Sequence, residues 1–163
     1  LIESGKPILF KQRRSGQGGH LYSIVKFRTM RQDAEADGQA LWTDDESDPR
    51  TTRVGRFLRK THLDEFPQFW NVLKGEMSII GPRPERPEFV TKLEKQIPFY
   101  RARLLVKPGI GGWAQINSGK GASVEGSTEK LEYDLYYIKH RNLLMDIWII
   151  IRTLGSVFGL RGV

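Results

Sequence analysis

The chain has no cysteine among its 163 residues. This absence excludes disulfides, thiolate zinc sites and cysteine nucleophiles, and it leaves oxygen-ligated metals such as magnesium as candidates. No apolar run reaches the roughly 18 residues that a bilayer-spanning helix needs, and the first residues lack the pattern of a signal peptide. The three histidines, His20, His62 and His140, do not have the spacing of metal ligands. The sequence therefore predicts a water-soluble or surface-bound chain.

Positive charge is in excess. The chain has 26 Lys and Arg against 19 Asp and Glu, a net charge of +7 and a pI near 9.8. This balance predicts an anionic partner, which can be nucleic acid, acidic lipid or a phosphorylated small molecule, and charge alone does not choose among them. The length predicts one domain over residues 1–163, able to bury about 70% of the surface of its unfolded chain.

The first part of the sequence predicts a β-hairpin. Residues 8–14 and 21–28 are strand-like runs on either side of residues 15–19, which include three glycines and suit a tight turn. In an extended strand Lys26 and Arg28 project from the same face. Two cations can therefore converge on one anion such as a phosphate.

Two further elements follow the hairpin. Residues 29–36 have the pattern of a short helix, and residues 37–49 are polar, acidic and rich in turn formers, which predicts a mobile loop. Residues 53–60 place apolar side chains at the i, i+3, i+4 spacing of a helix and leave the basic side chains on the opposite side. This segment is predicted to be a basic amphipathic helix.

Asp64 and Glu65 are adjacent carboxylates at the predicted start of a helix. Proline is tolerated in a first helical turn but not further in, so Pro67 places that start near Asp64. The N–H groups of Glu65 and Phe66 would then lack helical partners and form an anion site beside the carboxylates. The alternative is a single helix from residue 53 that is kinked at Pro67.

Arg83 follows on a stiff segment. Residues 77–80 are predicted to be a short buried strand, and residues 81–87 contain three prolines that restrict the backbone. Together with the two hairpin cations, Arg83 completes a set of two carboxylates and three cations that suits a diphosphate bridged by a metal. The simpler alternatives are that Asp64 is an ordinary N-cap and that the other charges form surface ion pairs.

The rest of the chain predicts helices. The glycine-rich segment 107–112 lacks the end of a Walker loop, so a phosphate cradle and a tight turn remain equal alternatives. The whole pattern predicts an α+β domain dominated by helices, with a small hairpin, short strands and interfacial amphipathic helices. Helices are expected at residues 88–96, 99–104, 129–142 and 143–158, with a loose loop at 118–128.

The last predicted helix is apolar around most of its circumference. It is too short to cross a bilayer, and Trp148 with the flanking cations Lys139, Arg141 and Arg152 is typical of a helix at the depth of lipid headgroups. We expect its middle to belong to the core and its end to lie at a membrane surface.

Six motifs, in order along the chain, resemble the bacterial sugar transferase family, the monotopic phosphoglycosyl transferases. The match runs from Gly5 to about Gly159. The motifs are Lys26-Phe27-Arg28-Thr29-Met30, Asp48-Pro49-Arg50-Thr51-Thr52-Arg53-Val54-Gly55, Leu63-Asp64-Glu65-Phe66-Pro67-Gln68, Asn71-Val72-Leu73-Lys74-Gly75-Glu76-Met77-Ser78, Gly81-Pro82-Arg83-Pro84 and Lys107-Pro108-Gly109-Ile110.

The resemblance implies transfer of a sugar-1-phosphate from a nucleotide diphosphate sugar, usually a UDP-sugar, to membrane polyprenyl phosphate, with Mg²⁺ and release of UMP. It implies that Asp64 is the nucleophile, that Glu65 helps Asp64 hold the metal, and that Lys26, Arg28 and Arg83 bind the diphosphate. Family members carry a membrane-inserted helix just before the stretch that matches Gly5, and this chain starts after it. The implied location is the cytoplasmic face of the bacterial inner membrane.

Two other classes of function compete with this interpretation. A basic nucleic-acid-binding module fits the charge, but no recognition-helix, RNP or zinc pattern supports it, so nucleic acid is not the expected partner. A non-catalytic scaffold at a membrane surface predicts lipid binding that does not depend on Asp64 or Glu65. Neither the sugar nor the oligomeric state follows from the sequence.

Overall fold

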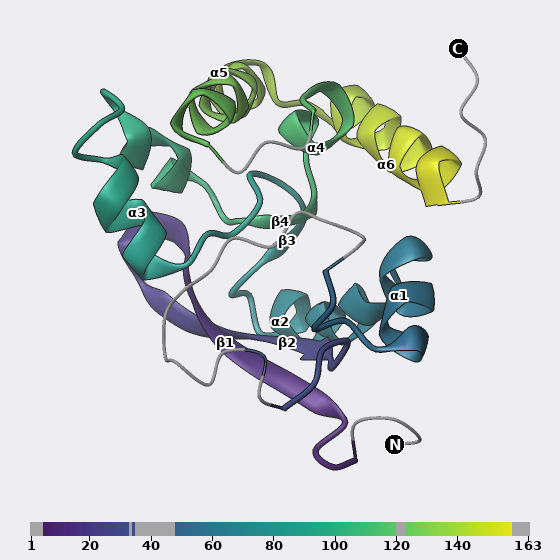
Figure 1. Cartoon of the computed structure of the whole chain (residues 1–163). Helices are drawn as coiled ribbons and strands as arrows, with labels where there is room; N and C mark the ends of the chain where they lie inside the picture. Colours follow the sequence, from purple (N-terminus) through teal and green to yellow (C-terminus); the bar gives the residue numbers. More distant parts are fainter. Residues whose placement is uncertain (1–4, 33, 35–47, 120–122, 158–163) are drawn as a thin grey trace.

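The structure, a computed structural model, describes residues 5–32, 34, 48–119 and 123–157. Its first elements are strand β1 (Leu9–Ser15) and strand β2 (Leu21–Phe27), which pair antiparallel with Leu9 opposite Phe27. A short 3-10 turn, η1 (Gln17–Gly19), joins them, and both Gly18 and Gly19 have positive φ. The predicted hairpin is therefore confirmed (Figure 1).

Helix α1 (Arg53–Lys60) confirms the predicted amphipathic helix. The hydroxyl of Thr52 caps it by accepting a hydrogen bond from the Gly55 N–H at 2.9 Å. Gly55 is needed there because a Cβ at this position would collide with the carbonyl oxygen of Thr29.

The predicted helix at residues 29–36 is wrong over the part of that range that the structure describes. Met30 instead forms an isolated antiparallel bridge with Thr51. The Thr29 carbonyl accepts from the Thr52 N–H at 3.0 Å, and the Arg31 N–H donates to the Arg50 carbonyl at 3.0 Å. These backbone groups bond to a distant segment, so they are not available for a local helix. The loop predicted at 37–49 lies outside the described residues up to residue 47.

The carboxylate pair lies in the 3-10 helix η2 (Leu63–Gln68), which continues into α2 (Phe69–Leu73). The predicted free N–H of Glu65 is wrong, because it donates to the His62 carbonyl at 3.2 Å. Pro67 is the fifth residue of η2 and not a first-turn residue. The alternative of one kinked helix is also wrong, since α1 ends at Lys60 and His62 has a left-handed φ of 54°.

Strand β3 (Ser78–Ile80) pairs in parallel with strand β4 (Gly109–Gly111), confirming the short predicted strand. The Gly81 N–H donates to the Gly111 carbonyl, and the Gly109 N–H donates to the Pro82 carbonyl, both at 2.9 Å. A Cβ on Gly109 would collide with the Gly81 nitrogen. The glycines of segment 107–112 therefore allow two segments of the chain to approach closely, and Gly109–Gly111 is a strand and not the tight turn that was one of the two alternatives. The phosphate cradle remains untested.

Helices form the second half of the chain. The Ser123 hydroxyl accepts from the Gly126 N–H at 3.0 Å and caps the long helix that follows, so that helix begins at residue 124 and not at 129 as predicted. The elements are α3 (Pro87–Leu93), η3 (Tyr100–Leu105), α4 (Trp113–Asn117), α5 (Val124–His140) and α6 (Leu143–Val157). The fold is the predicted helix-rich α+β domain.

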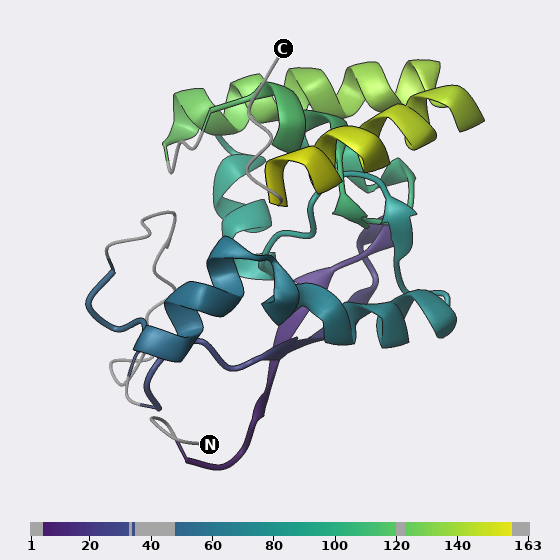
Figure 2. The same cartoon turned by 90° about the vertical axis from the view of Figure 1, so that its right-hand side faces the viewer.

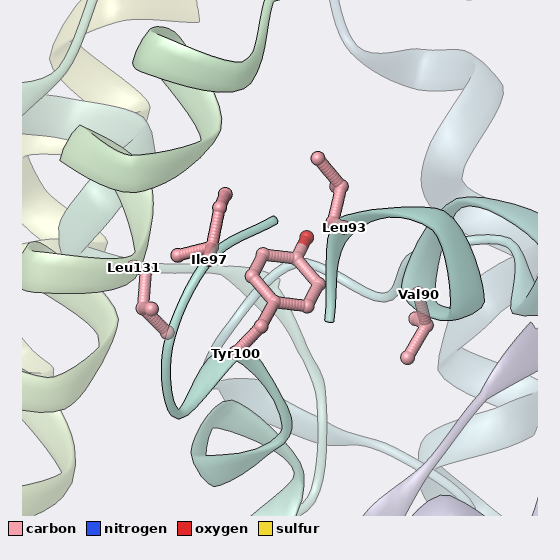
Figure 3. Packing of buried hydrophobic residues seen from close by; sticks show 5 residues of the cluster. All are labelled: Val90, Leu93, Ile97, Tyr100 and Leu131. Atoms are coloured by element: carbon pink, nitrogen blue, oxygen red, sulfur yellow. The ribbon is translucent and has the colours of Figure 1, made fainter. Parts of the chain in front are cut away.

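Three apolar clusters hold these elements together. The largest joins α3, η3 and α5 through Val90, Leu93, Ile97, Tyr100 and Leu131 (Figure 3). A second cluster packs Tyr22 and Ile24 of the hairpin against Met77. The third packs Ile80, Tyr137 and Ile149 together, and so fixes α6 beside β3.

Helix α6 exposes most of its apolar surface. Ile149 is fully buried, whereas Leu143, Leu144 and Leu154 are each more than half exposed. The expectation that the middle of this helix belongs to the core holds for Ile149 but is wrong for Trp148 and Ile151, which are also more than half exposed. Among the described residues, no helix combines the length and apolar character needed to cross a bilayer.

Candidate active site

The two carboxylates of η2 lie against strand β2. Asn71, on the helix that continues η2, fixes this arrangement by donating from Nδ2 to the Ser23 carbonyl at 2.8 Å and accepting from the Val25 N–H at 3.1 Å. Asp64 and Glu65 are each only 7% exposed. Two adjacent carboxylates with so little solvent need cations nearby, and the fold supplies them.

Glu65 is held by two cations. Its Oε1 lies 2.6 Å from Arg83 Nη2 and 3.7 Å from Lys26 Nζ. Burial alone would raise the pKa of Glu65, but Arg83 and Lys26 outweigh it and hold that pKa at about 2. Glu65 in turn raises the pKa of Arg83. Glu65 is therefore ionised and anchored at neutral pH.

Lys26 is mostly buried in this cluster. Its side chain is 20% exposed, and burial lowers its pKa to about 8 although Glu65 favours its charged form. It is thus a cation at pH 7 that loses its charge under mildly alkaline conditions.

Asp64 differs from its neighbour because its carboxylate makes no hydrogen bond or ion pair with any residue that the structure describes. Burial raises the pKa of Asp64, and the negative charge of Glu65 raises it further, while Lys26, Arg59 and Arg83 oppose the rise. A carboxylate that is partly desolvated and unbonded is available to react with an electrophile. The site therefore separates one anchored carboxylate from one free carboxylate.

The structure brings together four of the five predicted site residues, namely Asp64, Glu65, Lys26 and Arg83. The Arg28 side chain forms no ion pair with either carboxylate, although its N–H still donates to the Ile8 carbonyl at 2.8 Å beside the end of β2. A role for Arg28 in binding the diphosphate remains a prediction.

Two contributions to the site did not follow from the sequence. Arg59 of α1 donates from Nε to the Thr29 hydroxyl at 2.9 Å, and its charge lowers the pKa of Asp64. Arg53, Arg56 and Arg59 recur at intervals of three residues, and this helical spacing was a signal that could have placed Arg59. Behind Arg83, the buried Arg103 donates to the Arg83 carbonyl at 3.0 Å and lies 2.8 Å from Asp134.

A divalent metal can be held here by few protein ligands. The described residues contain no group of three or more His, Cys, Asp or Glu side chains arranged for a metal. Magnesium is commonly bound by one or two carboxylates together with substrate phosphates and water. The free carboxylate of Asp64 fits that pattern, whereas Glu65 Oε1 is already occupied by Arg83 and Lys26.

The chain matches a known protein family. The sequence profile of the bacterial sugar transferase family matches residues 1–160. The chain belongs to the bacterial sugar transferase family. This membership confirms the family predicted from the six motifs, and it gives no support to the nucleic-acid-binding alternative.

Three relatives of this bacterial sugar transferase show which proteins it is similar to. A UDP-N-acetylgalactosamine-undecaprenyl-phosphate N-acetylgalactosaminephosphotransferase of Aeromonas hydrophila is 45% identical over 98% of this chain and 38% of its own length. UDP-glucose:undecaprenyl-phosphate glucose-1-phosphate transferases of Xanthomonas campestris pv. campestris and Escherichia coli are 45% and 41% identical, over 97% and 96% of this chain and 33% and 34% of theirs. The chain therefore spans about a third of the length of these relatives.

Proposed function

We propose that this chain is the catalytic part of an enzyme that transfers a sugar-1-phosphate from a UDP-sugar to undecaprenyl phosphate. The activities for which the relatives are named support this reaction. The observation that carries the proposal is the free, buried carboxylate of Asp64 beside a Glu65 that two cations hold in place. Neither a nucleic-acid module nor a passive membrane scaffold needs such a pair.

The proposed reaction has two phosphoryl transfers. A carboxylate oxygen of Asp64 attacks the phosphorus that carries the sugar, and the bond from this phosphorus to the bridging oxygen breaks, so that UMP leaves. The sugar phosphate is then bonded to Asp64 as an acyl phosphate. A phosphate oxygen of the lipid attacks the same phosphorus, which restores the Asp64 carboxylate and forms the lipid diphosphate sugar. Neither step requires a general base, because both nucleophiles are anions.

The cations of the cluster make this attack possible. A carboxylate and a diphosphate repel each other, so positive charge must neutralise the developing oxyanions. Arg83, 45% exposed at its side chain, can turn part of its guanidinium to the donor while it holds Glu65, and Lys26 adds a second charge. Magnesium bound at Asp64, with Glu65 nearby, would supply further neutralisation of the diphosphate.

The reaction should become slower above about pH 8. Lys26 has a pKa near 8, so it loses its proton, and with it the positive charge beside the donor, as the pH rises through that value. We expect kcat/KM to fall on the alkaline side with an apparent pKa near 8, because kcat/KM reports the groups of the free enzyme. The measurement is a pH–rate profile from pH 6 to 10. Lys26→Arg is the matched variant, and an unchanged alkaline fall in that variant would contradict the assignment.

The nucleotide product tests the proposed chemistry. The protein is incubated with a UDP-sugar and Mg²⁺ in detergent, with and without undecaprenyl phosphate, and the released nucleotide is identified by chromatography. We expect UMP, with about one equivalent per enzyme when the lipid acceptor is omitted. Release of UDP would mean transfer of the sugar without its phosphate and would overturn the mechanism. Removal of Mg²⁺ with a chelator is expected to stop UMP release.

A membrane surface is the proposed location, on the cytoplasmic face of the inner membrane, because the acceptor is a lipid. Helices α1, α2 and α6 lie on the same face of the molecule (Figure 2). An apolar hollow lies between α2 and α6. The residues that line it include Val72, Ile79, Leu143, Ile147 and Ile150. Trp70, Leu73 and Leu144 are each more than half exposed there. We propose that this face docks on the bilayer.

A further inference from the structure

A second hollow lies at the start of α1 and is lined by charged residues. Neither Asp64 nor Glu65 lines it. Its volume is about 380 Å³. The residues that line it come from three segments, the end of the hairpin region, the turn before α1 and the first turn of α1 itself. They include Arg31, Asp48, Thr51, Thr52, Arg53 and Arg56.

The hollow carries a net positive charge. Arg31, Arg53 and Arg56 are exposed and form no ion pair with a residue that the structure describes. Asp48 does not neutralise them, because hydrogen bonds from Arg50 at 2.6 to 3.2 Å occupy its carboxylate and lower its pKa. Three guanidinium groups are thus available to one ligand, and the positive end of the α1 dipole adds to their field.

A buried hydroxyl in the wall of the hollow lacks a partner. Thr51 is 7% exposed, and its Oγ1 makes no hydrogen bond to any described residue. The neighbouring Thr52 shows the contrast, since its hydroxyl accepts from the Gly55 N–H and lies 3.2 Å from the Thr29 carbonyl. A buried hydroxyl without a partner lowers the stability of the folded state. Because Oγ1 is shielded from solvent, an anionic ligand in the hollow would accept its hydrogen bond once the Thr51 side chain rotates toward the hollow.

The hollow borders the apolar face. Val54 and Phe57, on the same helix as two of the arginines, are 47% and 61% exposed. Helix α1 shares its side of the molecule with α2 and α6 (Figure 2). A phosphate bound by the arginines can therefore belong to a molecule whose apolar part lies beside Val54 and Phe57. This arrangement suits a lipid better than a free ion.

We propose that this hollow binds the phosphate group of an anionic membrane lipid, with Arg31, Arg53 and Arg56 as the charged ligands and Thr51 as a hydrogen-bond donor. The inference rests on the membrane docking proposed above and adds a specific headgroup site to it. Binding there would fix the orientation of α1, and therefore of Arg59, relative to the bilayer.

Vesicle binding tests the inference. The protein is sedimented with phosphatidylcholine vesicles that contain or lack phosphatidylglycerol. We expect Arg53→Gln/Arg56→Gln to lose affinity for the anionic vesicles by roughly 25-fold, the product of about fivefold for each arginine near the surface, and to keep its affinity for neutral vesicles. Lys92→Gln/Lys95→Gln is the charge-matched control, because Lys92 lies in α3 and Lys95 just after it, and α3 lies on the opposite side of the molecule from α1 (Figure 1). If the two double variants lose the same affinity for anionic vesicles, the loss reflects the net charge of the protein and not a specific site, and the proposed headgroup site is overturned.

A second variant separates a bound headgroup from simple attraction. Thr51→Val removes the hydroxyl without a change of charge, and we expect it to weaken binding to anionic vesicles severalfold while thermal stability is kept or raised. Unchanged vesicle binding by Thr51→Val would remove the hydroxyl from the site. In a competition experiment, millimolar inorganic phosphate is added to the unaltered protein with anionic vesicles. If it weakens vesicle binding as much as the double arginine substitution does, the hollow binds a soluble phosphate and the lipid assignment is overturned.

Failure of membrane docking has a different signature. Leu143→Ser/Leu144→Ser should weaken binding to both kinds of vesicle, because it removes exposed apolar surface far from the hollow. If the unaltered protein binds neither vesicle, docking and the headgroup site both fall. If it binds both and the double arginine variant binds them equally well, docking stands and the headgroup site falls.

Discussion

Asp64→Asn is expected to abolish transfer. An amide has no anionic oxygen to attack phosphorus, and removal of a covalent nucleophile lowers the rate by a factor on the order of 10⁴ or more in other enzymes. The acyl phosphate should also disappear. Intact mass spectrometry after incubation with a UDP-sugar and Mg²⁺ measures the adduct, and UMP release measures turnover. Full activity in this variant would place the nucleophile on another residue.

Glu65→Gln is the matched control for that experiment. The two carboxylates are adjacent in sequence and equally buried, but Arg83 and Lys26 hold Glu65 and not Asp64. We therefore expect Glu65→Gln to retain the adduct while it lowers the rate and weakens the Mg²⁺ dependence. Loss of the adduct in Glu65→Gln, with the adduct kept in Asp64→Asn, would reverse the two roles.

Arg103→Met is expected to have the largest effect on stability. Arg103 and Asp134 are 6% and 1% exposed, and their side chains lie 2.8 Å apart. Loss of one partner leaves a buried charge without compensation, which costs about 3–5 kcal/mol. Arg103 also donates to the Arg83 carbonyl, so the variant should bind the donor less well. Urea unfolding and kcat/KM measure the two effects.

The pH dependence of Arg103→Met provides an internal check. Burial raises the pKa of Asp134, and removal of Arg103 takes away a charge that opposes this rise. The folded variant then binds a proton more readily than its unfolded chain, so its stability increases as the pH falls. We expect the deficit to shrink between pH 7 and pH 5. Arg103→Met/Asp134→Leu should recover most of the stability at pH 7, and a deficit as large as in the single variant would contradict the ion-pair explanation.

Much of the fold could be predicted where local pattern and tertiary packing agree. The hairpin and α1 followed from glycine turns and from apolar spacing. The helix predicted at 29–36 failed because Met30 and Arg31 bond to the chain around Thr51, a partner about twenty residues away that periodicity does not reveal. The expectation that the middle of α6 belongs to the core was wrong for Trp148 and Ile151, since a helix that is apolar around most of its circumference does not indicate which side packs.

The candidate site was predictable in part for a related reason. Adjacent acids and a proline-stiffened arginine are visible in the sequence, and they led to Asp64, Glu65 and Arg83. Arg28 was expected beside Lys26 because alternate residues of a strand share a face, but its side chain forms no ion pair with either carboxylate. Arg59 was missed because its approach to Asp64 depends on how α1 turns back at His62, where the backbone adopts a left-handed conformation. The sequence shows which chemical group stands at each position, but the distances between groups on different elements depend on how those elements pack.

The Asn71 contacts have a consequence for how the protein can change shape. The Asn71 side chain joins α2 to both Ser23 and Val25, and it also donates to the Glu76 carboxylate at 2.7 Å. The strand that carries Lys26 and the helix that follows Glu65 should consequently move together as a rigid body. Adjustment to donors of different size must then come from the parts outside this unit, the arginine segment between β3 and α3 and the amphipathic helix α1. Sugar preference in this protein would accordingly be sought in those two segments.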